Sequence, residues 1–267
     1  MRSIRLLAGV ALAVALTGCI NSTTLIKLKP DGSGTVEQTT LVNLSALKSM
    51  MPPGASQTSG PGVVSEAELK RTAEKMGRGV RLVSSTPVKE NGFEGVKATF
   101  AFDDINQVQI NQDPALGGGS SPDPAPSKPD DDPVRFKLTR QGGTSLLTIN
   151  IQDKPGSGGK DGTPQTDVPD MTDPMMMGML KTMFQGFKIN IALDVVGSIV
   201  KTNADYVSGS HITLLEMDMA ALLEDEAKFK ALQGKLGPDA SLSSVKPYLK
   251  DIKGIKVDGP VITVEFK

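Results

Sequence analysis

Apolar and polar residues alternate along much of this chain, which is the pattern of strands with one buried face. The longest run is 187–195, where apolar residues occupy the odd positions and polar or small residues the even ones. Other alternating stretches contain a turn sequence near their middle. They predict three antiparallel hairpins, at 26–42 around 30–34, at 80–102 around Asn91-Gly92, and at 136–151 around Gly142-Gly143.

Further apolar stretches at 199–201, 212–217 and 261–266 are expected to continue the same sheet. Apolar residues at the three- and four-residue spacing of a helix are less common. Ser65 and Glu68 form a capping box before a stripe of apolar or small residues, and Gly77 follows the stripe. These signals predict a helix that ends at about Met76.

Three other helices are expected. Thr172 or Asp173 is placed to cap one of them, with Pro174 in its first turn. Asp218 begins a second helical region that runs to about Leu236, and 242–252 predicts a short helix disturbed by Pro247. The fold class predicted is α+β, with a mainly antiparallel sheet built from hairpins and a few helices on one face.

Three stretches are rich in Gly, Pro, Ser and Asp and poor in residues that bury surface: 52–64, 111–133 and 153–173. Such composition predicts long disordered loops. Because strand patterns resume after each loop, residues 19–267 are expected to form a single α+β domain.

The N-terminus predicts an export signal. Arg2 and Arg5 precede an apolar run from Leu6 to Leu16, which is too short to span a bilayer as a helix of about 20 residues. Cys19 is the only cysteine, and it follows the small residues Thr17 and Gly18. The pattern predicts a signal peptide at 1–18 that is cleaved between Gly18 and Cys19.

The sequence Leu16-Thr17-Gly18-Cys19 resembles the lipobox of bacterial prolipoproteins. The resemblance implies a lipid anchor on Cys19, consisting of a diacylglyceryl thioether and an N-acyl group such as palmitate. The mature protein would then be held at the cell-envelope membrane on its extracytoplasmic side, which is the periplasm in a cell with an outer membrane. An ordinary secretory cleavage site with an unmodified cysteine is the alternative.

Charge and composition disfavour several partners. The formal net charge is −1, and loss of the two arginines of the signal peptide brings it to −3. Basic residues are interspersed with acidic ones, so no nucleic-acid partner is expected. The chain has no Trp and only two Tyr, which disfavours carbohydrate binding on aromatic platforms.

Few residues are suited to catalysis. His211 is the only histidine, and we expect it to be a surface residue with no catalytic role. An acylated Cys19 cannot serve as a nucleophile or a zinc ligand. Acidic groups at 130–132 and 167–173 lack the spacing of an EF-hand. We therefore expect no enzyme activity, no metal site and no cofactor.

A methionine cluster is the most ambiguous feature, and it comprises Met175, Met176, Met177, Met179 and Met183. Helical spacing places Met176, Met179 and Met183 on one stripe with Leu180 and Phe184, which favours packing against the sheet. Met175 and Met177 lie off that stripe. They leave open a second interpretation, a deformable wall that binds a lipid tail or an apolar protein surface.

Two segments, 196–204 and 209–214, are similar to the late part of LppM-type domains of bacterial lipoproteins. The lipobox, the turn Asp31-Gly32-Ser33-Gly34 and the helix and hairpin of 65–102 follow in the order of that family. The resemblance implies a compact α+β domain with an apolar cavity linked to binding of envelope lipids, and it brings no catalytic residues. The chain differs from that family in its long segments 111–133 and 153–173. It also ends on a strand, where many members of the family have a C-terminal membrane span.

Two functions follow as hypotheses. The first is a lipid-anchored, non-enzymatic envelope lipoprotein that binds an apolar or amphiphilic ligand, such as a lipid, at the membrane surface. The alternative is an assembly or scaffolding lipoprotein that binds another envelope protein. An apolar cavity would favour the first function, and an exposed apolar patch or an unpaired sheet edge would favour the second.

Overall fold

A computed structural model describes residues 20–43, 64–110, 134–151, 174–233 and 241–267. The predicted signal peptide at 1–18, its cleavage site and Cys19 lie outside the described residues. So do the predicted loops, with the exception of Val64 at the end of the first one.

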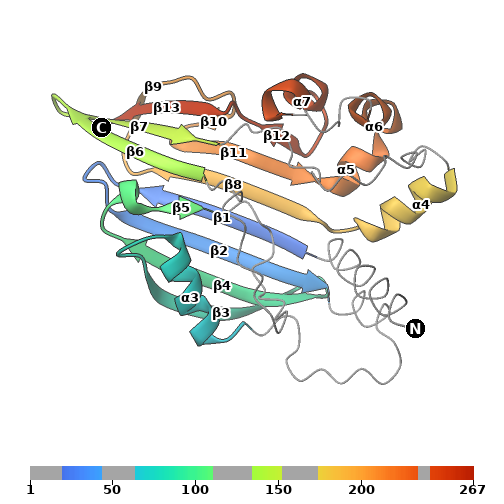
Figure 1. The fold of residues 1–267 in the computed structure, drawn as a ribbon, viewed down its shortest axis with the longest axis horizontal. Coiled ribbons are helices and arrows are strands. Elements are labelled where there is room, and N and C mark those ends of the chain that lie inside the picture. Colours follow the sequence, from blue (N-terminus) through green and yellow to red (C-terminus); the bar gives the residue numbers. More distant parts are fainter. Residues whose placement is uncertain (1–19, 44–63, 111–133, 152–173, 234–240) are drawn as a thin grey trace, which may run out of the picture.

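The larger of two sheets has β1 (Ile20–Leu28) and β2 (Gly34–Asn43) near its centre (Figure 1). Neighbouring strands are antiparallel, with the exception of β1 and β8, which run parallel. The strand order is β10-β11-β8-β1-β2-β4-β3, and β12 also pairs with β11. The remaining bounds are β3 (Arg81–Glu90), β4 (Phe93–Phe102), β8 (Lys188–Val195), β10 (Val207–Ser208), β11 (His211–Asp218) and β12 (Ile255–Val257).

The second sheet has five strands in the order β5-β6-β7-β13-β9. Their bounds are β5 (Gln109–Ile110), β6 (Val134–Gln141), β7 (Thr144–Asn150), β9 (Ile199–Thr202) and β13 (Val261–Phe266). The three predicted hairpins are confirmed as β1–β2, β3–β4 and β6–β7. The prediction that 199–201 and 261–266 continue a single sheet is wrong, because both lie in this second sheet.

The chain changes sheets at Gly197. Val196 N still donates to Leu28 O of the large sheet at 2.8 Å, whereas Ser198 N donates to Lys267 O beside β13 at 2.9 Å. Gly197 between them has a φ of 134°, a conformation that favours glycine. This turn directs β9 away from the end of β8 and onto β13.

The two sheets share one hydrophobic core. Ile26, Leu28 and Phe100 of the large sheet pack in the same cluster as Ile149 and Phe266 of the small one. α3 (Glu66–Met76) adds Leu69, Ala73 and Met76, and its predicted capping box is present, with Glu68 N donating to Ser65 Oγ at 3.3 Å. Each large buried apolar side chain contributes about 1.5–3 kcal/mol, so this cluster is the main source of stability.

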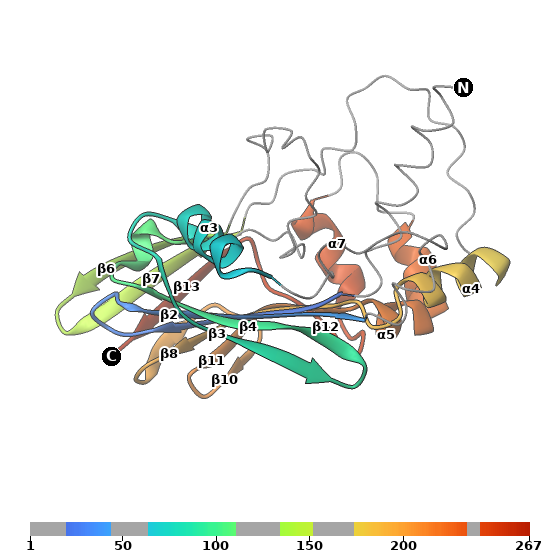
Figure 2. The ribbon, with the colours of Figure 1, turned by 90° about the horizontal axis from the view of Figure 1, so that it is seen from below.

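A second hydrophobic cluster lies under the C-terminal helices. It includes Leu223, Phe229 and Leu249, which come from α5 (Met219–Glu224), α6 (Glu226–Gln233) and α7 (Leu242–Leu249). The predicted helical region from Asp218 is thus two helices, because the Asp225 carboxylate caps the second one by accepting from Lys228 N at 3.1 Å. Figure 2 shows α3, α7 and the small sheet on the same side of the large sheet. The predicted α+β class with mainly antiparallel sheets is confirmed.

Candidate functional site

Four polar side chains are buried on the core-facing side of the two central strands. Ser22 and Thr24 belong to β1, and Gln38 and Thr40 belong to β2, with exposed fractions between 5% and 7%. The antiparallel register places Ser22 opposite Thr40 and Thr24 opposite Gln38. We call these four residues the polar island.

Apolar residues surround the polar island. Alternate strand residues share a face, so the cross-strand neighbours of each island residue point to the same side of the sheet. On β8 these neighbours are Ile189 and Ile191, and on β4 they are Val96 and Ala98. Along the strands the island is followed by Ile26 on β1 and preceded by Val36 on β2, both fully buried. A patch of hydrogen-bonding groups thus lies within an apolar wall.

The island does not satisfy its own hydrogen bonds. Gln38 Nε2 donates to Thr24 Oγ1 at a long distance of 3.5 Å. Gln38 Oε1 and Thr40 Oγ1 are buried and have no hydrogen-bond partner among the described residues. Rotating the Gln38 amide by about 180° would exchange the positions of its oxygen and nitrogen, and one of these two atoms would still lack a partner. A buried polar group left in this state costs about 1–3 kcal/mol, and such groups mark places where water or a ligand supplies the partner.

The polar island was not among the sites predicted from the sequence. The sequence nevertheless contains a signal for it, because buried and less buried residues alternate along 20–28 and 34–43. The positions of Ser22, Thr24, Gln38 and Thr40 fall on the same side of these strands as the buried Ile26 and Val36. A polar residue in the buried phase of a central strand is the observation that could have identified it.

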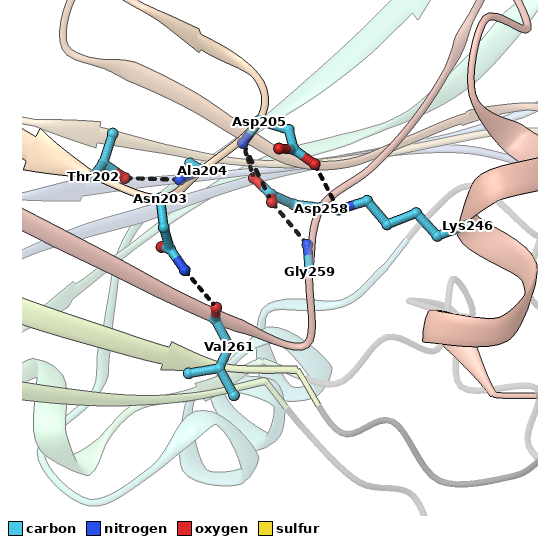
Figure 3. A network of polar contacts seen from close by, with 8 residues as sticks. All are labelled: Thr202, Asn203, Ala204, Asp205, Lys246, Asp258, Gly259 and Val261. Carbon is cyan, nitrogen blue, oxygen red and sulfur yellow. Dashed lines mark hydrogen bonds and ion pairs between the residues drawn. The ribbon is translucent and has the colours of Figure 1, made fainter.

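A second polar group lies where the two sheets meet, and Figure 3 shows it. Asp258 is 2% exposed, and its carboxylate accepts hydrogen bonds from Gly259 N at 2.7 Å and from Asp205 N at 3.2 Å. Lys246 Nζ of α7 pairs with Asp205 Oδ2 at 2.6 Å. Burial raises the pKa of the Asp258 carboxyl, against the opposing effect of its two backbone donors. Both carboxylates have partners within the fold, so this group connects elements to one another.

Asn203 and Thr202, in the 196–204 segment, form hydrogen bonds to the neighbouring strand β13. The Asn203 amide donates to Val261 O at 3.1 Å (Figure 3) and also accepts from Thr263 N at 2.6 Å. Both contacts fix β13 beside the chain. Thr202 Oγ1 donates to Thr263 O at 2.8 Å and accepts from Ala204 N at 3.0 Å. These contacts fix β9 and the residues that follow it to β13 within the small sheet.

His211 lies at the surface, as expected. Its Nδ1 is 2.7 Å from Asp194 Oδ1, and the two side chains are 42% and 32% exposed. The pair is on the face of the large sheet opposite the core, because the neighbouring Leu193 and Ile212 are fully buried. In the described ranges, no three His, Cys, Asp or Glu side chains are grouped closely enough to hold a metal ion.

The methionine helix α4 (Pro174–Met183) is present, and its predicted buried stripe is right at Leu180 and Phe184 but wrong at Met179. Met177 is buried at 4% exposed, whereas Met179 is 60% and Met175 is 85% exposed. The buried side holds Met177, Leu180 and Phe184, and Met176 is half-buried. Both sides of this helix are apolar, so spacing alone could not select which side faces the protein. The Met183 side chain and the predicted caps Thr172 and Asp173 lie outside the described part.

Similarity to known proteins is found at the level of structure and not of sequence. No protein-family model and no curated protein matches the sequence. Among solved structures, the chain is similar to the folded domain of the Mycobacterium tuberculosis LppM protein, determined by NMR, at 11% identity and a TM-score of 0.36. The match covers 94% of this chain and 91% of that one. Within the described residues, no helix is both long and apolar enough to cross a membrane.

Proposed function

We propose that this protein is a lipid-anchored, non-enzymatic lipoprotein of the bacterial cell envelope that binds an amphiphilic, lipid-like ligand at the membrane surface. The polar island is the observation that carries the binding proposal, because its buried Gln38 Oε1 and Thr40 Oγ1 lack partners among the described residues within an apolar wall. The lipobox at Cys19 supports the anchor.

The chemistry of the island defines the ligand. Gln38 Oε1 requires a hydrogen-bond donor, and the Thr40 hydroxyl can donate or accept. None of the four island residues is charged, so the matching polar group is a neutral hydroxyl or amide. The neighbouring Ile189, Ile191 and Val96 are suited to the acyl part of the same molecule. The ligand class is therefore a neutral amphiphile with a hydroxyl or amide near its acyl chain.

The island also lies close to the proposed anchor. Ser22 follows Cys19 by three residues of sequence. At a rise of about 3.3 Å per strand residue, the island begins about 7 Å from Ile20, the first residue of β1, to which Cys19 is joined. A ligand taken from the same membrane would have a short path to it.

The test is native mass spectrometry of the full chain, extracted from a bacterial envelope in mild detergent. Wild type is expected to retain lipid, and the double variant Gln38→Leu, Thr40→Val is expected to lose it. Thr39→Val is the matched control, since Thr39 points to the opposite side of β2. Wild type that is consistently empty, or a double variant that retains the same lipid, would contradict the proposal.

The alternative, a scaffold that binds another envelope protein, finds less support. Edge strand β3 of the large sheet contains Pro87, and its pairing is interrupted between Leu82 and Ser84. Proline and bulges both disfavour pairing of an edge with another chain. The exposed Met175 and Met179 of α4 form an apolar patch of the kind that would favour this alternative. The patch lies at the end of the large sheet where the proposed anchor begins, however, which favours contact with the membrane over contact with another protein.

A further inference from the structure

The exposed methionines of α4 lie at the end of the molecule where the proposed lipid anchor begins. β1 and β8 run parallel, and Asn21 lies opposite Lys188 at the start of both strands. Ile20 is the first residue of β1, and one peptide bond joins it to Cys19. α4 ends at Met183, shortly before β8 (Figure 1). The methionines and the anchor therefore share one end of the large sheet.

No spacer separates the anchor from the folded domain. Ile20 is already paired with Val42 of β2. Consecutive Cα atoms are about 3.8 Å apart, so acyl chains attached at Cys19 would hold this end of the sheet against the lipid headgroups. The domain cannot then move away from the membrane on a flexible tether, and whatever lies at this end meets the bilayer.

The exposed side of α4 is apolar at this end. Met175 and Met179 are four residues apart, so they lie on the same side of the helix. Their exposed fractions are 85% and 60%, while the opposite side of the helix is fixed to the protein through Met177. Flexible thioether side chains adapt well to irregular apolar surroundings such as acyl chains.

Charge contributes little to this surface. Lys181 Nζ of α4 pairs with Glu226 Oε1 at 2.8 Å, and Lys188 Nζ pairs with Asp218 Oδ2 at 2.7 Å. Because each of these cations is next to a carboxylate, attraction to anionic headgroups is weakened. The apolar side chains are left as the main basis for contact with a membrane.

We propose that α4 inserts Met175 and Met179 into the interface of the bilayer that holds the Cys19 anchor. An interfacial helix buries its apolar side by about 5–10 Å, which would fix the orientation of the domain on the membrane. The polar island would then be held at a constant height above the lipid. This inference rests on the proposed anchor, but not on ligand binding at the island.

Tryptophan fluorescence provides the test, because the chain contains no Trp. The full chain carrying Met179→Trp, and separately Met175→Trp, is purified from bacterial membranes and reconstituted into vesicles of phosphatidylethanolamine and phosphatidylglycerol. The measurement is repeated in the same vesicles with brominated acyl chains, which quench a nearby Trp. Val196→Trp is the matched control. Val196 is 52% exposed, and its N–H donates to Leu28 O at the opposite end of β1.

Both methionine variants are expected to emit at shorter wavelength in vesicles and to lose most of their intensity with brominated lipid. Val196→Trp should show neither change. The effect should persist when phosphatidylglycerol is omitted, because charge is not its basis.

Three results would overturn the inference. Emission of Met179→Trp and Met175→Trp that is indifferent to brominated lipid, from protein that floats with the vesicles, would overturn insertion and leave the anchor intact. A blue shift that is equal without lipid would show that protein covers the helix. An intact mass without acyl groups, together with loss of flotation, would overturn the anchor and the insertion together.

Discussion

The backbone N–H of Asp205 donates to the buried carboxylate of Asp258, with distances of 3.2 and 3.4 Å to its two oxygens. This contact joins the chain that leaves β9 to the chain that enters β13, and Lys246 extends it to α7 (Figure 3). It is one of the points at which the small sheet, the large sheet and the helical cluster are connected.

The first prediction concerns the pH dependence of stability at Asp258. Burial raises the pKa of this carboxyl above its ordinary value of 3.8, so the folded state favours the protonated form. Its contribution to stability is complete below pH 3.8 and is lost as the pH rises through the folded pKa. Asn cannot titrate. The free energy of unfolding of wild type relative to Asp258→Asn should therefore be larger near pH 4 than at about pH 7 in urea titrations.

Asp31 provides a control of opposite sign. Hydrogen bonds from the Ser33 hydroxyl and backbone lower the pKa of its carboxyl. Its contribution is present above the unfolded pKa and is lost as the pH falls through the folded one. Wild type relative to Asp31→Asn should thus gain stability as the pH rises. A gain of stability with rising pH in both comparisons would contradict the assignment at Asp258.

The second prediction concerns the polar island without ligand. Thr40→Val replaces a buried hydroxyl that has no hydrogen-bond partner in the described part of the chain with a methyl group of similar shape. Because the desolvation cost of the hydroxyl disappears, the ligand-free protein should become more stable by about 1–2 kcal/mol. Chemical denaturation of protein stripped of lipid measures this, with Thr39→Val expected to lie within about 0.5 kcal/mol of wild type. A clear loss of stability in Thr40→Val would mean that the hydroxyl already has a partner.

Local features of this fold could be predicted from the sequence. The Asn91-Gly92 turn and the Ser65–Glu68 capping box depend on residues a few positions apart, and both are present. Asp104 likewise caps a short 3-10 helix, η2 (Ile105–Gln107), by accepting from Asn106 N at 2.9 Å, a contact between residues two apart. Each of these signals is complete within one short segment.

Long-range features could not be predicted in the same way. The separation into two sheets depends on pairing of β13 with β7 and β9, and no local pattern specifies which strands meet. The side of α4 that is buried was unpredictable because methionine occupies both sides. The polar island needed the register of β1 against β2 before its four residues could be recognised as one group.

The third prediction compares two glycines. A Cβ at Gly197 would lie 2.2 Å from Lys267 O, and the backbone φ there is 134°. Gly197→Ala should therefore destabilise the protein by about 1–3 kcal/mol and loosen β9 from β13. A Cβ added at Gly178, inside α4, would meet no described residue within 4 Å outside the backbone of its own helix, so Gly178→Ala should add about 0.5–1 kcal/mol. Thermal unfolding of both variants tests this, and destabilisation by both would contradict it.

The fourth prediction concerns the anchor. Cys19→Ala removes the only thiol of the chain and therefore the only site for a thioether-linked lipid. One acyl chain gives marginal membrane residence and two or three give durable residence, so the variant should move from the membrane fraction to the soluble extracytoplasmic fraction, or remain as uncleaved precursor. Cell fractionation with intact mass measurement separates these outcomes. Cys19→Ser is the matched control, because it retains a small polar residue at the cleavage site and should behave like Cys19→Ala. Undiminished membrane association of processed Cys19→Ala protein would show that another part of the chain provides the anchor, and α4 would be the first segment to test.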